Sequence, residues 1–330
     1  MVARTVERAR RRLGLLLSVP PQTGVPLSKF TTLRVGGPAA LFAVADSLSD
    51  LHAVIETVTY YSLPLLILGR GSNLLVADSG FDGLVLTLGK DFSHIRMDSG
   101  AGHLDSGSLD ADRRSKSNEA LEVVAGAAAS LSALTRFAAA QGLAGLSFAV
   151  GVPGTVGAAV AVNAGAHGAD MASIAKQVTV YTSDCRLVLM EAAQLGFSYR
   201  HSELAPGSVV VEARFSLRQG EPRAIAAEME EHFSRRKETQ PLNMPSAGSA
   251  FKNPQGASAG QLIEQSGCKG LSIGGARVSP KHANFIVNAG DASADDVYRL
   301  LLTVQARVLE QTGVRLEPEW RFAGSFDLEG

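Results

Sequence analysis

Two glycine-rich loops carry the residue types best suited to holding an anion. The first, Gly69-Arg70-Gly71-Ser72-Asn73, directly follows a short apolar run at 63–68. Glycines let backbone N–H groups approach an anion closely, and Ser72 and Asn73 add side-chain donors, so this loop could hold phosphate. It has neither the third glycine of the dinucleotide fingerprint nor a Walker lysine. Alone, the motif therefore favours a tight turn slightly over a ligand loop.

The second loop runs through Gly151-Val152-Pro153-Gly154-Thr155-Val156-Gly157 and on to Asn163-Ala164-Gly165-Ala166-His167-Gly168. Backbone with so few large side chains loses much entropy on folding, which a plain connector has little reason to accept. A ligand lying against the backbone explains this composition, and close packing of two backbones explains it equally well. Two such loops on one chain favour a long ligand with a diphosphate, such as a dinucleotide.

Bulk composition limits the partners. The chain has 330 residues, 45% of them hydrophobic and 19% charged, which is ordinary for a globular protein of two or three domains. The net charge of -1 gives no general attraction for nucleic acid or an anionic membrane surface, so we expect neither partner. Any bound anion must be held by a local site, and we expect the protein to act as a monomer.

The two cysteines, Cys185 and Cys268, lie far apart in the sequence and form no CxxC pair. This excludes a readable disulfide framework or zinc cluster and fits a reducing cytoplasm. His167 has no histidine, cysteine or carboxylate at metal-ligand spacing around it, so we expect it to be a loop residue and the chain to bind no metal.

Hydrophobic periodicity divides the chain into elements. We expect helices at 47–61, from 130 to the glycine at 142, at 223–237, at 258–266 and at 293–311, and strands at 63–68, 74–76, 84–88, 121–124, 178–181 and 209–217. Residues 98–117 are rich in Ser, Asp, Gly and Arg and predict a mobile loop. The first 27 residues form a basic extension, helical or frayed, because the apolar run at 13–19 is too short to span a membrane.

Several stretches occur in an order that resembles the UDP-N-acetylenolpyruvoylglucosamine reductase family, over roughly residues 28 to 324. They are Thr31 to Ala39, Gly69 to Asn73, Gly151 to Gly168, Tyr199 to Ser202, Pro245 to Pro254, Lys281 to Asn288 and Glu317 to Glu319. The branch it resembles has a short segment after the Tyr-Arg pair.

The resemblance implies an α+β fold. An FAD-binding domain of the vanillyl-alcohol-oxidase (PCMH) type would occupy 28–218, in subdomains of about 28–89 and 90–218, and a smaller α+β substrate domain would occupy 219–330. It also implies a reaction: NADPH reduces non-covalently bound FAD, and the flavin then reduces the enolpyruvyl group of UDP-N-acetylglucosamine enolpyruvate. The product is UDP-N-acetylmuramate for peptidoglycan.

Matching positions imply residue roles. Ser249 matches the family's proton donor, Arg200 its active-site arginine and Glu319 its C-terminal active-site glutamate. Substrate contacts fall on Tyr199, Lys237, Asn253 and His282. Contacts to FAD fall on Gly69, Arg70, Gly71, Ser72, Asn73, Gly151, Pro153, Gly154, Thr155, Gly157, Asn163 and Gly165.

Each residue alone has an ordinary structural explanation. Ser249 could be a turn serine, Arg200 a surface arginine and Glu319 a solvated strand charge. For Lys237, a helix-end charge explains the residue nearly as well as a substrate contact does. Trp320 departs from the family, which commonly has a small aliphatic residue there. A flavoprotein oxidase of the same fold and a non-catalytic nucleotide-binding module are the alternatives, and the Pro245 to Pro254 motif argues against the oxidase.

Overall fold

The structure, a computed structural model, describes residues 2–98 and 121–326. Of the loop predicted at 98–117, all but Asp98 lies outside the described residues. Residues group by contact into two compact units. The first unit comprises 1–89, 183–185 and 234–330, and the second comprises 90–182 and 186–233. The units describe compactness and not ligand binding, so the predicted domain bounds stay a prediction.

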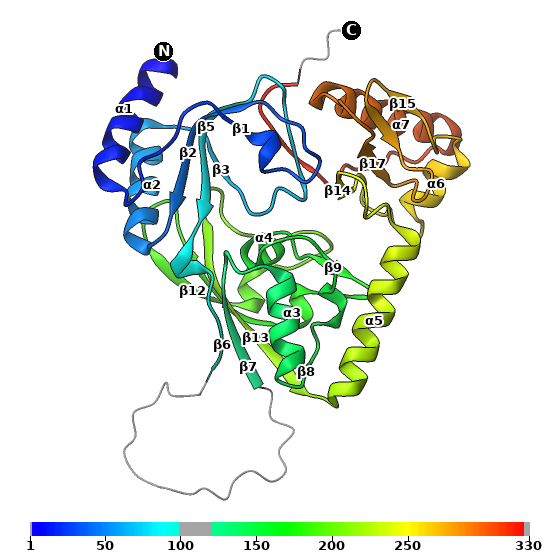
Figure 1. Cartoon of the computed structure of the whole chain (residues 1–330), viewed down its shortest axis with the longest axis horizontal. Helices are drawn as coiled ribbons and strands as arrows, with labels where there is room; N and C mark the ends of the chain where they lie inside the picture. Colours follow the sequence, from blue (N-terminus) through cyan, green and yellow to red (C-terminus); the bar gives the residue numbers. More distant parts are fainter. Residues whose placement is uncertain (1, 99–120, 327–330) are drawn as a thin grey trace, which may run out of the picture. The chain divides into compact units, whose positions relative to one another are not determined.

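The N-terminal part of the first unit is a four-stranded sheet with the order β1-β2-β5-β3, in which β2 and β3 run parallel to β5 (Figure 1). Its elements are α1 (Val2–Leu16), β1 (Val25–Pro26), η1 (Leu27–Lys29), β2 (Pro38–Ala45), α2 (Leu48–Tyr61), β3 (Leu65–Ile67), β4 (Leu74–Val76) and β5 (Phe81–Leu88). Helix α2 packs on β2, and α1 packs on α2. The predicted helix at 47–61 is confirmed, and Ser47 and Asp50 close its first turn as a capping box.

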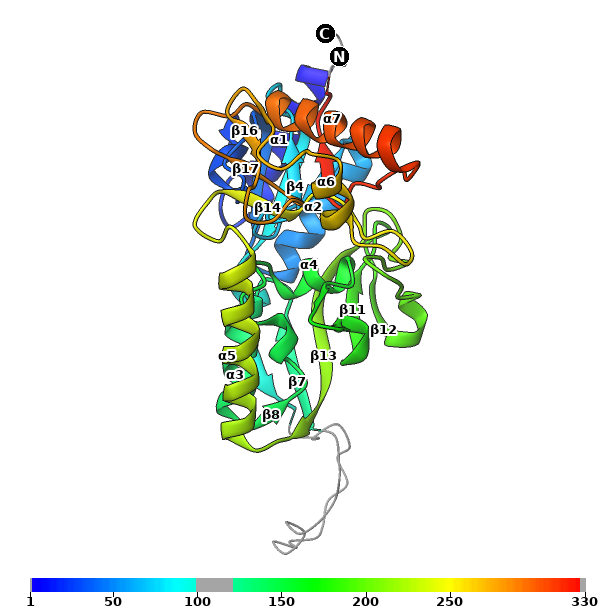
Figure 2. The same ribbon diagram turned by 90° about the vertical axis from the view of Figure 1, so that its right-hand side faces the viewer.

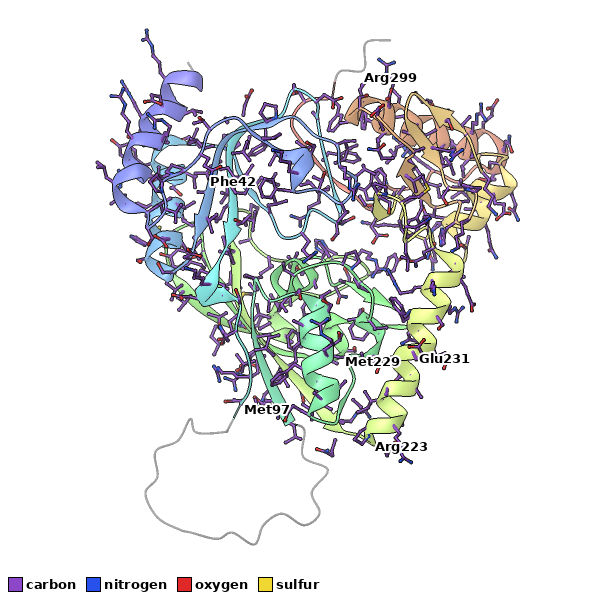
Figure 3. The ribbon with its side chains drawn as sticks, viewed as in Figure 1. Phe42, Met97, Arg223, Met229, Glu231 and Arg299 are labelled. Atoms are coloured by element: carbon purple, nitrogen blue, oxygen red, sulfur yellow. The ribbon has the colours of Figure 1, made fainter. Side chains whose placement is uncertain are left out.

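The N-terminal extension is a helix and not a frayed tail. Ala9, Leu13 and Leu17 are buried, while the arginines lie on the rest of its surface. The sheet buries a small apolar core that includes Phe42, labelled in Figure 3, and the exposed Phe30 ring lies tilted against Phe42 with ring centroids 4.7 Å apart. This core holds the strands that lead into the first glycine-rich loop.

The C-terminal part of the first unit is an antiparallel sheet with the order β14-β17-β16-β15, and helix α7 packs against three of its strands (Figure 2). Its elements are β14 (Ser246–Ser249), α6 (Ala259–Gln265), β15 (Ser272–Ile273), β16 (Ala276–Val278), β17 (Phe285–Asn288), α7 (Ala294–Thr312) and β18 (Arg321–Ala323). The helix predicted at 293–311 is confirmed: Ser293 and Asp296 close its first turn as a capping box, and Gly313 ends α7 in the left-handed conformation.

These two parts of the first unit share one core. Leu33, Val35 and Leu75 are buried in the same apolar cluster as residues of β14, β16, β17 and α7. Strand β18 returns to pair in parallel with β4. The Asp78 carboxylate also accepts from the backbone N–H groups of Ala294 and Asp295, at 3.0 Å each. The N-terminal and C-terminal parts of the first unit are therefore joined by a shared core, a strand pair and the hydrogen bonds of Asp78.

The second unit is built on an antiparallel sheet with the order β12-β11-β13-β7-β6, and β8 also pairs with β13. Figure 2 shows β11, β12 and β13 side by side. Its elements are η2 (Lys90–Phe92), β6 (Ile95–Met97), β7 (Leu121–Gly126), α3 (Leu131–Ala140), β8 (Leu143–Ala144), η3 (Ser147–Ala149), α4 (Val156–Ala161), β9 (Gly165–Ala166), β10 (Ala169–Asp170), η4 (Met171–Ser173), β11 (Ala175–Tyr181), β12 (Leu187–Glu191), η5 (Ala192–Leu195) and β13 (Val209–Gln219).

The strand predicted at 209–217 is confirmed as β13, and from Val211 to Leu217 its residues alternate between buried and half-buried. Helix α5 (Pro222–Thr239) confirms the helix predicted at 223–237, with residues 222–233 in the second unit and 234–239 in the first. Ile225 is its single buried residue. Within the described residues, no helix is long and apolar enough to cross a membrane.

Candidate active site

The first glycine-rich loop, Gly69 to Asn73, lies in the first unit between the end of β3 and the start of β4. Gly71 has φ +60°, and a Cβ there would lie 2.2 Å from the Phe30 carbonyl oxygen. Protein packing alone therefore requires glycine at this position. Arg70 is exposed and Ser72 is half-buried, which leaves a cation and a hydroxyl on the accessible side of the loop.

Ser249 is the last residue of β14 and lies opposite Phe285 of β17. The register shifts between Ser246 and Ser249, and within this bulge Gly248 has φ +76°. A bulge changes the direction of the side chains that follow it and is common beside active sites. Ser249 is half-buried, so its hydroxyl has limited contact with solvent.

The backbone after Ser249 is fixed by the buried side chain of Asn284. Its Oδ1 accepts from Phe251 N at 2.9 Å and its Nδ2 donates to Phe251 O at 2.8 Å, while Ala250 N donates to Asn284 O at 2.8 Å. Sequence reasoning did not assign Asn284, although it lies in the 281–288 stretch that resembles the family.

Glu319 lies on a segment that pairs with the residues after Ser249. Glu319 N donates to Ala250 O at 2.9 Å, and Lys252 N donates to Glu317 O at 2.8 Å. Glu319 is half-buried, while Trp320 beside it is 4% exposed and belongs to the shared core. Trp320, at which the sequence departs from the family, is therefore a residue of the core.

The first loop contacts both of these segments. Asn73 Nδ2 donates to Glu319 O at 3.2 Å, and Arg321 N donates to Asn73 O at 3.1 Å. Thr32 N donates to Gly71 O at 3.1 Å, while Thr32 Oγ1 donates to Ser246 O at 2.7 Å. The first unit thus brings together the first loop, the strand of Ser249 and the segment of Glu319.

Three predicted substrate contacts also lie in the first unit. Lys237 is exposed in the last turn of α5, and its carbonyl accepts from Lys281 Nζ at 2.6 Å. Asn253 Oδ1 accepts from Ala259 N at 3.0 Å, at the start of α6. Burial, reinforced by the positive charge of Lys269, lowers the pKa of His282. Since His282 Nδ1 accepts from Asn284 N, at 3.3 Å, the neutral ring carries its proton on Nε2, which can donate.

In the second unit, the glycines of the second loop differ in their surroundings. A Cβ at Gly157 would lie 2.7 Å from Ala127 Cβ, so close packing of α4 requires this glycine. A Cβ at Gly154 would meet only Leu131 Cδ1, at 3.6 Å, which is ordinary contact. The Thr155 side chain makes no capping bond to α4. Close packing therefore explains the glycine at 157, whereas the packing of the protein itself does not require glycine at 154.

Asn163 lies within the second loop, two residues after α4, and is 2% exposed. Its Nδ2 donates to Asp170 Oδ2 at 3.0 Å and to Ser198 O at 2.9 Å, and its Oδ1 accepts from Ala172 N at 2.9 Å. Both amide protons are therefore used within the protein. At the tip of the β9–β10 hairpin, His167 stacks on His232 with ring centroids 4.0 Å apart. This contact agrees with the predicted role of His167 as a loop residue.

Arg200 lies in a tight turn of the second unit, where Ser198 and His201 exchange two backbone hydrogen bonds of 3.1 Å. Its φ of +57° is in the left-handed region, and its guanidinium lies 5.3 Å from the centre of the Tyr199 ring. Non-glycine residues with such a φ concentrate at functional sites. Asn163 holds this turn through Ser198, so the second unit brings together the second loop and Arg200.

The residues of each loop fit a flavin dinucleotide. The first loop offers a cation at Arg70 and a hydroxyl at Ser72, and the second offers open backbone at Gly154 beside the Thr155 hydroxyl. These are the donors that a diphosphate needs. Within the described residues, no group of three or more His, Cys, Asp or Glu side chains could hold a metal ion.

Comparison with known proteins gives two family models. The model described as "FAD binding domain" matches residues 39–190, and the model described as "UDP-N-acetylenolpyruvoylglucosamine reductase, C-terminal domain" matches 240–323. The predicted order of an FAD-binding domain followed by a smaller C-terminal α+β domain is confirmed.

Proteins that are similar to this chain over about nine tenths of its length are UDP-N-acetylenolpyruvoylglucosamine reductases. A UDP-N-acetylenolpyruvoylglucosamine reductase from Heliobacterium modesticaldum is 44% identical over 301 residues, which cover 91% of this chain and 89% of that protein. One from Agathobacter rectalis is 42% identical over 311 residues, covering 93% and 96%. The crystal structure of the UDP-N-acetylenolpyruvylglucosamine reductase from Thermus caldophilus superposes with a TM-score of 0.75 at 36% identity, covering 92% of this chain and 99% of that one.

These matches extend over nearly all of the chain and agree with the ordered motifs found in its sequence. The chain therefore belongs to the UDP-N-acetylenolpyruvoylglucosamine reductase family, FAD-dependent enzymes that use NADPH to reduce the enolpyruvyl group of a sugar nucleotide for peptidoglycan synthesis.

Proposed function

We propose that this chain reduces UDP-N-acetylglucosamine enolpyruvate to UDP-N-acetylmuramate, with Ser249 as proton donor and with Arg200 and Glu319 acting on the substrate carboxylate. FAD, when bound, passes a hydride from NADPH to the terminal vinyl carbon of the enolpyruvyl group. Negative charge then develops on the adjacent carbon and its carboxylate. The chain's own residues must stabilise that charge and deliver one proton.

Ser249 is the group that delivers the proton. A serine hydroxyl is a weak acid, but the carbanionic centre is a strong base, so the transfer is downhill. The observation that carries the proposal is the arrangement around the bulge in β14: the backbone after Ser249 pairs directly with Glu319, and the first loop contacts both segments. The serine is therefore held on fixed backbone at limited exposure, as proton transfer to one carbon requires.

Arg200 binds the substrate carboxylate. The Arg200 guanidinium is permanently charged and planar, so it can bind a carboxylate with two parallel hydrogen bonds. Its left-handed φ and its stacking on Tyr199 support a fixed orientation. Glu319 hydrogen-bonds the protonated form of the enediolate, or orients the group that does so.

The remaining substrate contacts are Tyr199, Lys237, Asn253 and His282. Lys237 is exposed and can meet a diphosphate as a point charge. The neutral His282 ring offers Nε2–H as a donor, because its pKa is lowered by burial. FAD is held by the backbone and side-chain donors of 69–72 and 151–157. The FAD-binding domain comprises 28–218 and the substrate domain 219–330, and the enzyme acts as a cytoplasmic monomer without a nucleic-acid or membrane partner.

The test separates the two half-reactions of the Ser249→Ala variant. Under anaerobic conditions, NADPH should bleach the bound flavin at nearly the wild-type rate, because Ser249 takes no part in that step. Return of the flavin colour on adding the enolpyruvyl sugar nucleotide should be slower by about 10² to 10⁴-fold, the usual contribution of a positioned proton donor. Stopped-flow absorbance measures both rates.

Ser246→Ala is the matched control, since Ser246 lies on the same strand and its contact to Thr32 uses the backbone carbonyl. It should leave both rates within a few-fold of wild type. A Ser249→Ala variant in which both half-reactions fall together would show that Ser249 is structural, and a wild-type flavin that the sugar nucleotide does not reoxidise would overturn the proposed reaction.

A further inference from the structure

Two side chains that take no part in the proposed reaction join the first glycine-rich loop to the strand of Ser249 and to the segment of Glu319. The loop lies at 69–73, whereas Ser246 and Glu319 come more than 170 residues later. Segments so distant in sequence come into contact only in the folded protein, so local structure cannot set their relative position. Asn73 and Thr32 make these contacts.

Asn73 makes two hydrogen bonds to the Glu319 segment, one on each side of Trp320. Its side-chain Nδ2 donates to Glu319 O at 3.2 Å, while its own carbonyl accepts from Arg321 N at 3.1 Å. The parallel pairing of β4 and β18 begins directly after these bonds, with Leu74 beside Arg321. The backbone on both sides of Trp320 is therefore bound to this one asparagine.

Thr32 makes the corresponding link to the strand of Ser249. Its backbone N–H donates to Gly71 O, and its hydroxyl donates to Ser246 O at 2.7 Å, with a longer contact of 3.4 Å to Gly71 O. A Cβ added at Gly248 would also have Ser72 O as its nearest neighbour, at 3.9 Å. The loop backbone thus runs alongside the bulge that ends in Ser249.

The surrounding packing makes these links stiff. Leu33, Leu75, Ala250 and Trp320 are each less than 5% exposed and lie in one apolar cluster. Glu319 N also donates to Ala250 O, so the Ser249 and Glu319 segments are bonded to each other and to the loop. Packed interiors resist small displacements, so removal of one link must shift a segment or leave a polar group unpaired.

We infer that Asn73 and Thr32 are positioning residues that set Glu319 and Ser249, respectively, against the first glycine-rich loop, and that the Asn73 side chain serves Glu319. This inference rests on the proposed function. It assigns Asn73 a role different from the phosphate donor expected from the sequence, because the donor Nδ2 is directed at a backbone carbonyl of the catalytic segment.

The first experiment uses Asn73→Leu, which keeps a similar volume and removes the donor. The FAD dissociation constant, measured by flavin fluorescence on the apoprotein, should stay within about threefold of wild type, and flavin reduction by NADPH should be unchanged. Reoxidation by the sugar nucleotide should slow by up to about 10²-fold, the effect of a displacement of about 1 Å on a reacting group. A large loss of FAD affinity with normal reoxidation of the flavin that still binds would overturn the inference.

The second experiment tests whether Asn73 acts through Glu319. Glu319→Gln alone should slow reoxidation, and adding Asn73→Leu to it should cost at most a few-fold more, because residues that act through one another are not additive. If the double variant loses the product of the two single effects, Asn73 does not act through Glu319. If Glu319→Gln alone leaves reoxidation normal, the role proposed for Glu319 fails instead, so the two failures are distinguishable.

Thr32 keeps the test valid if Asn73→Leu folds poorly. Thr32→Val has nearly the same shape but lacks the hydroxyl, and it should slow reoxidation without changing FAD affinity, whereas Thr32→Ser should restore the rate. Asn288→Leu is the control: Asn288 Nδ2 donates to Leu33 O at 3.2 Å, a similar side-chain link that ends on neither the Ser246 carbonyl nor the Glu319 carbonyl. It should lower the melting temperature and leave reoxidation per bound flavin normal. If Thr32→Val reoxidises as fast as wild type, the inference for Thr32 is wrong.

Discussion

The two glycine-rich loops look alike in sequence, but the protein uses their glycines differently. In the first loop, Gly71 has a left-handed φ and no room for a Cβ against the backbone of 30–31. In the second, Gly157 is required by packing, whereas Gly154 has ordinary space around it. Glycine density therefore marks a place where backbones approach something closely, and only the neighbours show whether that is the protein itself or open to a ligand.

The asparagine at the end of each loop shows a likeness that the sequence does not reveal. Asn73 donates to the carbonyl of Glu319, and Asn163 donates to the carbonyl of Ser198, two residues before Arg200. Each unit thus connects one glycine-rich loop to one proposed catalytic segment by a side-chain amide. Within its own unit, each link thus fixes a glycine-rich loop relative to one proposed catalytic residue, Glu319 in the first unit and Arg200 in the second.

The largest effect should come from Gly71→Ala. An alanine with this φ costs about 1–2 kcal/mol, and its Cβ would also overlap the Phe30 carbonyl oxygen and Thr31 Cα, so unfolding should become easier by more than about 3 kcal/mol in total. Thermal or urea unfolding measures the change.

Gly24→Ala separates the two causes, since Gly24 has φ +64° with nothing within 4 Å of the added Cβ. It should lose only the backbone part, about 1–2 kcal/mol. If both variants lost the same free energy of unfolding, the first loop would be able to shift and accommodate the Cβ at residue 71. The contrast between the two loops would then disappear.

The sequence predicts some helices and strands well and misses others. Helices α2 and α7 were predicted, because clear helical periodicity follows Ser47 and Ser293. Strand β12 and helix α4 were not predicted. Strand β12 is exposed or half-buried throughout, and α4 is a six-residue run of small and β-branched residues without a polar face. Neither has a periodicity to detect.

For the site, the sequence supplied candidate residues through a resemblance, and their partners came only from the fold. The bond from Asn73 to Glu319 joins residues 246 apart, and no local pattern encodes such a pairing. Thr32 and Asn284 lay inside stretches that resemble the family, yet their side chains act on backbone groups of other segments. A motif identifies that a residue matters, while the hydrogen-bond partner identifies what it does.

A smaller effect distinguishes the ligand-facing part of the second loop. Gly154→Ala adds a Cβ that meets only Leu131 Cδ1 at 3.6 Å, so the free energy of unfolding of the apoprotein should change by no more than about 0.5 kcal/mol. If FAD lies against this backbone, the same methyl group should raise the FAD dissociation constant by about tenfold, equivalent to about 1.4 kcal/mol.

The melting curve of the apoprotein is the internal control for Gly154→Ala, and fluorescence titration with FAD is the measurement. An unchanged dissociation constant would mean that the glycines of the second loop serve packing throughout, as Gly71 does in the first.

The smallest effect on FAD binding should come from Gly168, which with His167 forms the two-residue turn between β9 and β10. Both residues have positive φ, +84° and +53°, as the common hairpin turn requires, and nothing lies within 4 Å of a Cβ added at Gly168. Gly168→Ala should therefore cost only backbone strain, about 1 kcal/mol, or roughly 2–4 °C in melting temperature, and Gly168→Asn should cost less because asparagine tolerates this conformation. FAD affinity should be unchanged in both variants. If Gly168→Ala weakened FAD binding as much as Gly154→Ala, the open backbone of the second loop would extend to the hairpin tip, and the ligand-facing stretch would be longer than the surroundings of Gly154 indicate.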